Sequence, residues 1–382
     1  MACSPFNIFA VTSTGKIYTW GEFLVAGTGD EQDLEDDEHT VPIPRMVREL
    51  SSNGVIYVDS NEIAAACCIT GAGELYTWGN GYLGILGHGD DIDQRTPKRV
   101  DALAGVNVKQ VVLADFHTTV CTEDGQVYTF GCGSHGRLGH GDKDEHKFSP
   151  VMVQALEGKH ITQVQQERYN TMALTSSGYV FTWGTSEYDH LWDDSKMLQC
   201  ISIPYLVEGL REHNVIHLAK NSFEHCAVLV DHTSPSIIRQ SQRDSFNNKE
   251  HSDVVFMVEN KPVYANIDVI SQKCDYFKAM FRSNMRESIE RVVEVPNCSK
   301  GAFLRILEYL CMDDFTISIG HVVELWGLAD MYLLEGLKYS CIGALEMGVC
   351  KDNVSQIMQE LEELCCECDG LKRVCHEYLT RT

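Results

Sequence analysis

The feature that most constrains this chain is a seven-residue segment that recurs four times in its first half. The copies read GKIYTWG, GELYTWG, GQVYTFG and GYVFTWG, and they begin at residues 15, 73, 125 and 178. In each copy alternating apolar and aromatic letters stand between two glycines, which is typical of a short strand with one buried face and tight turns at both ends. The recurrence predicts a strand-rich repeat with a period near fifty residues.

A second short apolar run precedes each copy. The runs begin at residues 7, 62, 117 and 170, and small or polar pairs (ST, GA, ED and SS) separate them from the glycine that follows. Run, turn and run together predict a β-hairpin. A fifth first run, EHCAVLVD at 224–231, has no second run after it, so we expect the repeat to stop halfway through a unit.

Repeats of this kind bury their strand faces by stacking radially, as the blades of a propeller do. The chain holds only about four units, which four arrangements could accommodate. These are a small closed ring, an open arc covered by the rest of the chain, an arc completed by a second molecule, and a chain that lacks N-terminal blades. Because an open arc exposes strand edges that proteins usually protect, we expect burial against a partner or a missing segment.

Two units share a glycine-rich segment, GILGHGD at 84–90 and GRLGHGD at 136–142. A phosphate loop places its glycines between a strand and a helix and usually carries GK[ST], and neither copy does so. We expect the glycines to allow sharp turns between strands while Leu86 and Leu138 pack into the blade. His88 and His140 recur with the motif, as structural residues would. The predicted turn glycines are Gly84, Gly87, Gly89, Gly136, Gly139 and Gly141.

The stretch GQVYTFGCGSHGRLGHGD, followed by SPVMVQAL and ITQVQQERYNTMALTSSG, resembles the regulator of chromosome condensation repeat. The resemblance implies a β-propeller, commonly of seven blades in that family. The first copy has the acidic run DEQDLEDDE at 30–38 in place of the glycine-rich segment, and the fourth reads GTSEYDHLWDDSKM. The best-known activity of the family is nucleotide exchange on a small nuclear GTPase, but many members use the repeat only as an interaction platform.

The texture of the sequence changes after residues 232–250, a polar stretch with a Ser-Pro pair that is typical of a linker. Two short apolar runs then flank a turn at Glu259 to Lys261, and helical spacing follows, which predicts a mixed α and β unit. The predicted core positions of its helices are Phe277, Met280 and Phe281, then Phe303, Ile306, Leu307 and Leu310.

The motifs SDVVFMV, VYA, YFKAMF, MRES and VVELWGLADMYLLEGLKYSC occur in an order that resembles the BTB domain. That resemblance implies homodimerisation through an N-terminal helix and strand. The chain departs from the family at Ala265-Asn266-Ile267, where Ala-His-Lys is usual. The tail resembles the helical extension called the three-box. Ile357, Leu361 and Leu364 share one helix face, and Leu371, Val374 and Leu379 suit a second helix after Asp369-Gly370.

In BTB proteins that recruit the cullin three scaffold of ubiquitin ligases, a hydrophobic-x-Glu element follows the Phe-rich helix. Met285 and Glu287 occupy that position here. An exposed apolar side chain can anchor in a partner's pocket while a nearby carboxylate orients it. The alternative is that Met285 packs inward and Glu287 is only solvated.

Composition excludes several classes of function. The net charge is -24 with both halves acidic, which makes nucleic acid an improbable partner. The sequence has no run of about 20 apolar residues that would span a membrane, and no export signal, so its 16 cysteines are expected to be free thiols. We expect no catalytic, cofactor or metal site, because GxSxG is absent and the terminal cluster lacks paired CxxC spacing. The cluster consists of Cys365, Cys366, Cys368, Cys375 and His376.

The sequence therefore predicts propeller-type repeats over 1–231, a linker over 232–250, a BTB domain over 251–348 and three-box helices over 349–382. We expect a cytoplasmic, or alternatively nuclear, adaptor that dimerises through its BTB domain and presents cargo bound by the repeats to a cullin-three ligase. One alternative is a guanine-nucleotide exchange factor or regulator of a Ras-like small GTPase. The other is an oligomeric scaffold without ligase function.

Overall fold

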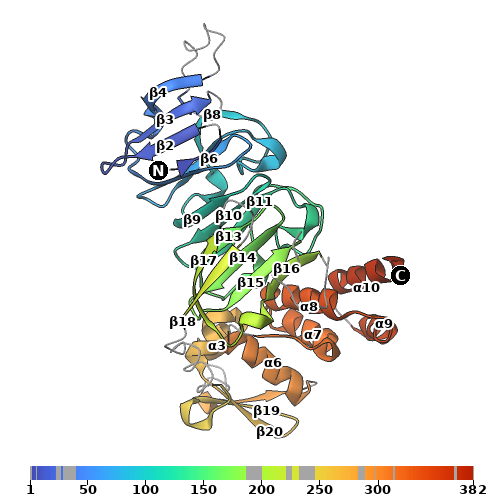
Figure 1. Ribbon diagram of the computed structural model, residues 1–382. Helices are drawn as coiled ribbons and strands as arrows, with labels where there is room; N and C mark the ends of the chain where they lie inside the picture. Colours follow the sequence, from blue (N-terminus) through green and yellow to red (C-terminus); the bar gives the residue numbers. More distant parts are fainter. Residues whose placement is uncertain are drawn as a thin grey trace.

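The computed structural model describes residues 2–5, 7–22, 27–28, 40–185, 200–220, 226–231, 246–282, 289–296, 298–312, 315–364 and 368–381. Strands dominate as far as residue 231, and helices dominate from residue 267 onward. In Figure 1 the sheets follow one another from the blue N-terminal blade to the yellow-green β17 and β18, and the orange and red C-terminal part lies against the last blades.

The first half consists of four four-stranded antiparallel sheets and one two-stranded sheet. Each full sheet takes four consecutive strands in chain order, so each is one blade. The strands of the blades are β1 (Ala2–Cys3), β2 (Asn7–Val11), β3 (Ile17–Glu22), β4 (Thr40–Met46), β5 (Val55–Ser60), β6 (Ala65–Thr70), β7 (Leu75–Gly79), β8 (Gln94–Arg99), β9 (Val108–Leu113), β10 (His117–Thr122), β11 (Val127–Gly131), β12 (Lys147–Met152), β13 (Ile161–Gln166), β14 (Asn170–Thr175), β15 (Val180–Gly184) and β16 (Ile201–Leu206).

The repeated hairpins are confirmed as β2–β3, β6–β7, β10–β11 and β14–β15. The middle strands β6, β10 and β14 are buried along their whole length. The glycine that ends each seven-residue copy lies close to the start of the neighbouring strand, and this close approach leaves no room for a side chain. At Gly131, with φ +108°, an added Cβ would lie 2.7 Å from the carbonyl oxygen of Phe116, so a side chain would push the two strands apart.

The blades form an open arc that ends in the two-stranded sheet of β17 (Asn214–Lys220) and β18 (Cys226–Asp231). Among the described residues this last unit has two strands, where each complete blade has four. Glutamine side chains join successive blades. Gln110 donates to Val164 O (2.8 Å) and accepts from Val164 N (2.9 Å), and Gln163 makes the same pair of bonds to Leu218.

Short 3-10 turns connect many of these strands and begin two segments of the second half. They are η2 (Arg48–Leu50), η3 (Tyr82–Gly84), η4 (Asp101–Leu103), η5 (Ser134–Gly136), η6 (Gln154–Leu156), η7 (Glu208–Leu210), η8 (Lys249–His251) and η9 (Ile319–His321).

The second half is a three-stranded sheet covered by helices, in the order β20-β19-β21 with β19 and β21 parallel. Glu259 and Asn260 both have positive φ (51° and 59°), as a two-residue hairpin turn requires. The elements are β19 (Val254–Val258), β20 (Lys261–Ala265), α3 (Ile267–Lys273), α4 (Asp275–Arg282), β21 (Val292–Val295), α6 (Lys300–Cys311), α7 (Val322–Met331), α8 (Glu335–Gly348), α9 (Val354–Glu363) and α10 (Asp369–Arg381).

Aromatic rings centre this core, because Phe256 on β19 contacts Phe277 on α4 at 5.5 Å and Phe303 on α6 at 4.9 Å between centroids. The predicted core face of α6 is confirmed, with all four of its residues buried. Asn266, the departure from Ala-His-Lys, is the N-cap of α3, and its side chain accepts from Val269 N.

The second helix predicted for the tail is confirmed as α10, although its three predicted apolar residues are not all buried. Leu371 and Val374 of α10 are buried, but Leu379 is 49% exposed. At about 100° per residue, Leu379 lies about 140° around the helix from Val374. Cys375, one residue after Val374, takes the buried position instead.

Candidate partner-binding surfaces

The glycine-rich segments form turns built around a threonine and a histidine. All six predicted glycines have positive φ, between 68° and 91°, and Leu86 and Leu138 are buried. The hydroxyl of Thr129 donates to Leu138 O (2.6 Å), so it accepts from His140 Nε2–H (2.9 Å). Thr77, Leu86 and His88 repeat this arrangement in the preceding blade.

Burial lowers the pKa of both histidines, to about 4 for His140, and nearby Lys147 adds to the effect. Each ring is therefore neutral at physiological pH and donates one structural hydrogen bond. This arrangement holds a turn and places no general base beside a nucleophile.

The predicted cullin-binding residues Met285 and Glu287 lie outside the described residues. They follow α4 in sequence, and a hollow of about 930 Å³ adjoins that helix. Its lining includes Asp253 and Asp268 and, opposite in charge, Lys278, Arg282 and Arg291. Asp253 accepts from Ile267 N (2.7 Å) and so joins the start of β19 to α3.

A polar joint connects the third and fourth blades to the helical part. Glu346 of α8 is nearly buried and accepts from Ser202 Oγ (2.8 and 3.0 Å). Lys143, just after the glycine segment of the third blade, forms ion pairs of 3.2 Å with Glu346 and with Glu377 of α10. Burial opposes the charge of Lys143, but the two carboxylates raise its pKa above the ordinary value.

Apolar contacts continue the same joint. Ile203 of β16 and Ala155 of η6 are fully or almost fully buried within the core of the second half, and Figure 1 shows α8 beside β16. Gly336 allows α8 to approach η6, because an added Cβ would lie 2.8 Å from Gln154 O. From the sequence we expected the open arc to be buried against a partner or completed by a missing segment. In the structure, the C-terminal half of the same chain covers part of the arc.

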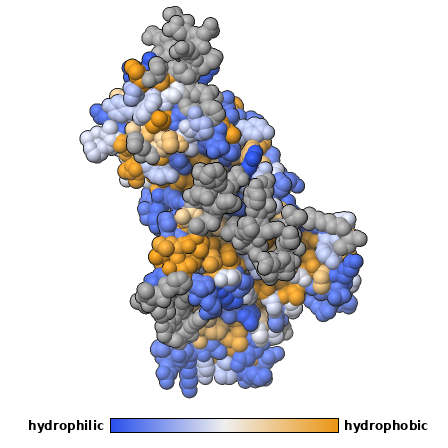
Figure 2. Space-filling model, viewed as in Figure 1, coloured by the Kyte–Doolittle hydropathy of each residue, from blue (hydrophilic) through white to orange (hydrophobic). Residues whose placement is uncertain are grey.

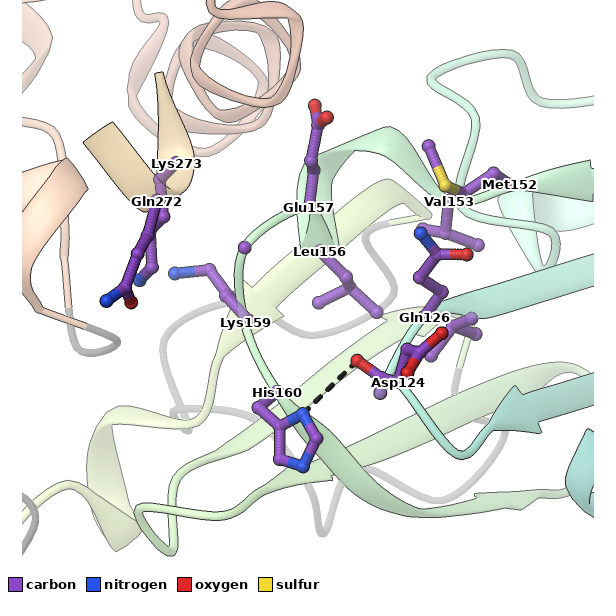
Figure 3. Close-up of a pocket in the computed structure, with 13 residues that line it drawn as sticks. Asp124, Gln126, Met152, Val153, Leu156, Glu157, Lys159, His160, Gln272 and Lys273 are labelled. Carbon is purple, nitrogen blue, oxygen red and sulfur yellow. Dashed lines mark hydrogen bonds between the residues drawn. The ribbon is translucent and has the colours of Figure 1, made fainter. Parts of the chain in front are cut away.

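A cleft of about 300 Å³ lies at the edge of this joint. Figure 3 shows Lys159 extending toward Gln272 and Lys273 of α3, while His160 donates to Asp124 O (3.2 Å). Burial raises the pKa of Glu157. No Ser, Thr, Cys or Tyr is among the described residues that line the cleft, so a side-chain hydroxyl or thiol nucleophile does not face it.

An arginine–aromatic cluster, which the sequence did not predict, lies where three segments of the third and fourth blades meet. We define it as Phe116, His135, Arg137, Arg168 and Tyr169. The guanidinium carbon of Arg137 lies 5.5 Å from the ring centre of Phe116 and 5.0 Å from that of Tyr169, and that of Arg168 lies 5.2 and 5.5 Å from the same centres. His135 meets Tyr169 edge to face at 5.4 Å.

A single residue of the sequence could have indicated this cluster. Arg137 in GRLGHGD stands where GILGHGD has Ile85, and both positions are buried, at 2% and 0% exposure. A charged residue at an apolar position of a repeat indicates a local function or a compensating partner.

The cysteine cluster near the C-terminus was the remaining candidate site from the sequence. Within the residues that the structure describes, no group of three or more His, Cys, Asp and Glu could hold a metal ion. Cys368 and Cys375 are buried, and Cys365 and Cys366 lie outside the described part. None of the described helices is long and apolar enough to cross a membrane.

Three family models match parts of the chain. The BTB/POZ domain matches residues 243–348, and the regulator of chromosome condensation (RCC1) repeat matches residues 72–121 and 124–174. A second model of that repeat matches residues 108–137.

Curated relatives are similar over the repeats. The chain is 36% identical over 222 residues to human E3 ubiquitin-protein ligase HERC2, which covers 58% of this chain and 4% of HERC2. It is 31% identical over 200 residues to the Arabidopsis thaliana ultraviolet-B receptor UVR8, which covers 52% of this chain and 44% of that protein. The chain thus spans less than half the length of these relatives.

Solved structures share the fold of the repeats. Human WBSCR16 matches with a TM-score of 0.51 and 19% identity over 60% of this chain and 58% of that one. Yeast RCC1 (Prp20), in its structure with Kap60, matches with a TM-score of 0.51 and 17% identity over 64% of this chain and 56% of the matched chain.

Proposed function

Because the chain joins RCC1 repeats to a BTB/POZ domain, we propose that it is a dimeric, non-catalytic adaptor that presents cargo held by its repeats to a cullin-three ubiquitin ligase. RCC1 repeats and BTB domains both typically mediate protein interactions. The proposal adds the direction of transfer: cargo on the blades, the cullin on the BTB domain, and a second copy of the chain at the BTB pairing surface.

The observation that carries this proposal is the joint between the two halves. Glu346 receives hydrogen bonds from Ser202 and an ion pair from Lys143, and Ile203 is buried in the core of the BTB part. A flexible tether would leave the cargo at random orientations, whereas a packed joint holds the blades in one orientation relative to the BTB domain. Such a geometry suits an adaptor that must deliver cargo to a fixed catalytic partner.

The cullin step is tested by calorimetric titration of the full chain with the cullin three N-terminal domain. We expect the double variant Met285→Ala, Glu287→Ala to lose at least about tenfold in affinity for the cullin, because it removes an apolar anchor and its orienting carboxylate. Met331→Ala is the matched control, since Met331 is 56% exposed on α7, at a distance in sequence from the proposed contact.

The folded state and dimerisation of each variant are checked by circular dichroism and light scattering. Unchanged cullin affinity in a folded, dimeric double variant would refute the ligase step. The adaptor would then be a scaffold without a ligase, which was one of the sequence-based alternatives.

A further inference from the structure

Among the described residues, no carboxylate pairs with the two arginines of the arginine–aromatic cluster. Arg137 donates from Nε to Ser134 O (2.7 Å) and from Nη1 to Arg168 O (2.8 Å), and both acceptors are neutral carbonyl groups. Across the described ranges, no carboxylate lies within ion-pair distance of Arg137 or Arg168. This is unusual in a chain with a net charge of -24.

The acidic residues nearest in sequence are already engaged. Glu167 Oε2 accepts from Asn170 Nδ2 at 2.7 Å, and Asp115 Oδ1 accepts from Glu62 N at 3.2 Å. A desolvated guanidinium without a carboxylate is costly, and aromatic faces compensate only part of that cost. Burial accordingly lowers the pKa of Arg137.

Hydrogen bonds hold the backbone of the cluster, and two of its side chains are exposed. Phe116 O and Tyr169 O accept from Cys132 N and Thr185 N at 2.8 and 2.9 Å, and the carbonyl of Arg137 accepts from Trp183 Nε1 at 2.9 Å. Arg168 and His135 are exposed, while Phe116 and Tyr169 are half-buried. The exposed guanidinium of Arg168 and the buried guanidinium of Arg137 thus lie against the same two rings.

We propose that this cluster binds a carboxylate side chain of an acidic peptide segment on the adaptor's cargo protein. A planar guanidinium matches a carboxylate with two parallel hydrogen bonds, and rigid Tyr and Arg side chains are typical centres of protein interfaces. The acidic surface elsewhere repels extended polyanions such as nucleic acid, so a short acidic segment is the favoured occupant. This inference rests on the adaptor function proposed above, because it names the chemistry of the cargo.

The test uses a fluorescein-labelled hexaglutamate peptide and a hexaglutamine peptide with the intact chain, with binding followed by fluorescence anisotropy at low ionic strength. We expect hexaglutamate alone to bind, and added salt to weaken it. Arg168→Gln removes the exposed charge and should lower affinity about tenfold. Arg137→Ile, which installs the residue of the preceding blade, should lower it at least as much.

Arg95→Gln is the matched control, because Arg95 is exposed on β8 and the substitution changes the net charge equally. Affinity lost equally in Arg95→Gln and Arg168→Gln would show a net-charge effect and overturn the proposal. So would the absence of hexaglutamate binding by the wild-type chain.

Cullin binding is measured on the same variants. Arg168→Gln should retain it, and Met285→Ala with Glu287→Ala should retain hexaglutamate binding. Failure of the peptide site and failure of the cullin site are therefore separate results.

Discussion

The turn that holds a blade together depends on the protonation of one ring. Thr129 uses its only hydroxyl hydrogen on Leu138 O, so His140 must donate from Nε2 and leave Nδ1 without a proton. A second proton would place a charge in a buried position. The sequence motif predicted a structural histidine, but periodicity could not show this hydrogen-bond direction, which depends on a contact between β11 and the turn that follows it.

Acid should therefore destabilise the blades through His140. Its pKa is about 4 in the folded chain against 6.5 when exposed, so its contribution to stability is complete above pH 6.5 and is lost as pH falls toward 4. The loss amounts to at most about 3 kcal/mol. Urea unfolding between pH 7 and pH 4 should show a shallower pH dependence in His140→Gln than in the wild type.

His160→Gln makes the same side-chain change at an exposed position outside the glycine-rich turns and is the control for that measurement. Glu145 favours the protonated form of His140 and Lys147 opposes it, so both should be retained. Identical slopes in the wild type and His140→Gln would contradict the assignment.

At the scale of elements, the half-blade is the least protected part of the arc. Leu229 of β18 pairs with His217 just as Leu174 of β14 pairs with Gln163, yet Leu229 is 57% exposed and Leu174 only 3%. Every complete blade covers this position with a third strand. Figure 2 shows hydrophobic surface gathered where β17 and β18 lie in Figure 1.

The two leucines form a matched pair for experiment. Leu174→Ala should reduce the free energy of unfolding by about 3 kcal/mol, because it removes a buried side chain and leaves a cavity. Leu229→Ala should reduce it by less than about 1 kcal/mol. Denaturant unfolding measures both, and an equal cost would mean that another strand covers β18 in solution.

How much of this organisation the sequence predicts depends on the range of the interactions. Alternation and turn glycines are local, so the hairpins and the half unit at 224–231 followed from them. Helical spacing predicted α10 but did not show that Leu379 is exposed. Arg137 was missed because its partners Phe116 and Tyr169 come from two other turns. Met285 and Glu287 stay predictions, because they lie outside the described residues.

At the scale of the whole molecule, the joint makes one body of two modules that the sequence presents as separate. A linker-like stretch at 232–250 suggested independence. Lys143 and Ser202 nevertheless both contact Glu346, which lies 144 residues after Ser202 in the sequence. No periodicity of either module could show that contact. Cooperative unfolding of the two halves is its expected consequence, because neither can move without breaking a nearly buried polar network.

A double-mutant cycle on Lys143→Met and Glu346→Gln tests that coupling. Breaking the pair leaves a partly desolvated charge, so each single variant should lower the free energy of unfolding, and the cycle should give a coupling of about 1–3 kcal/mol. Scanning calorimetry should show the single transition of the wild type dividing into two, as the blades and the BTB part melt separately.

Lys338→Met is the control, because Lys338 pairs with Asp330 and Glu335 inside the BTB part. Its loss should lower stability without dividing the transition. If Glu346→Gln also leaves a single transition and shows no coupling to Lys143, the halves are held by the apolar contacts of Ile203 and Ala155 alone, and Ile203→Ala becomes the variant that should separate them.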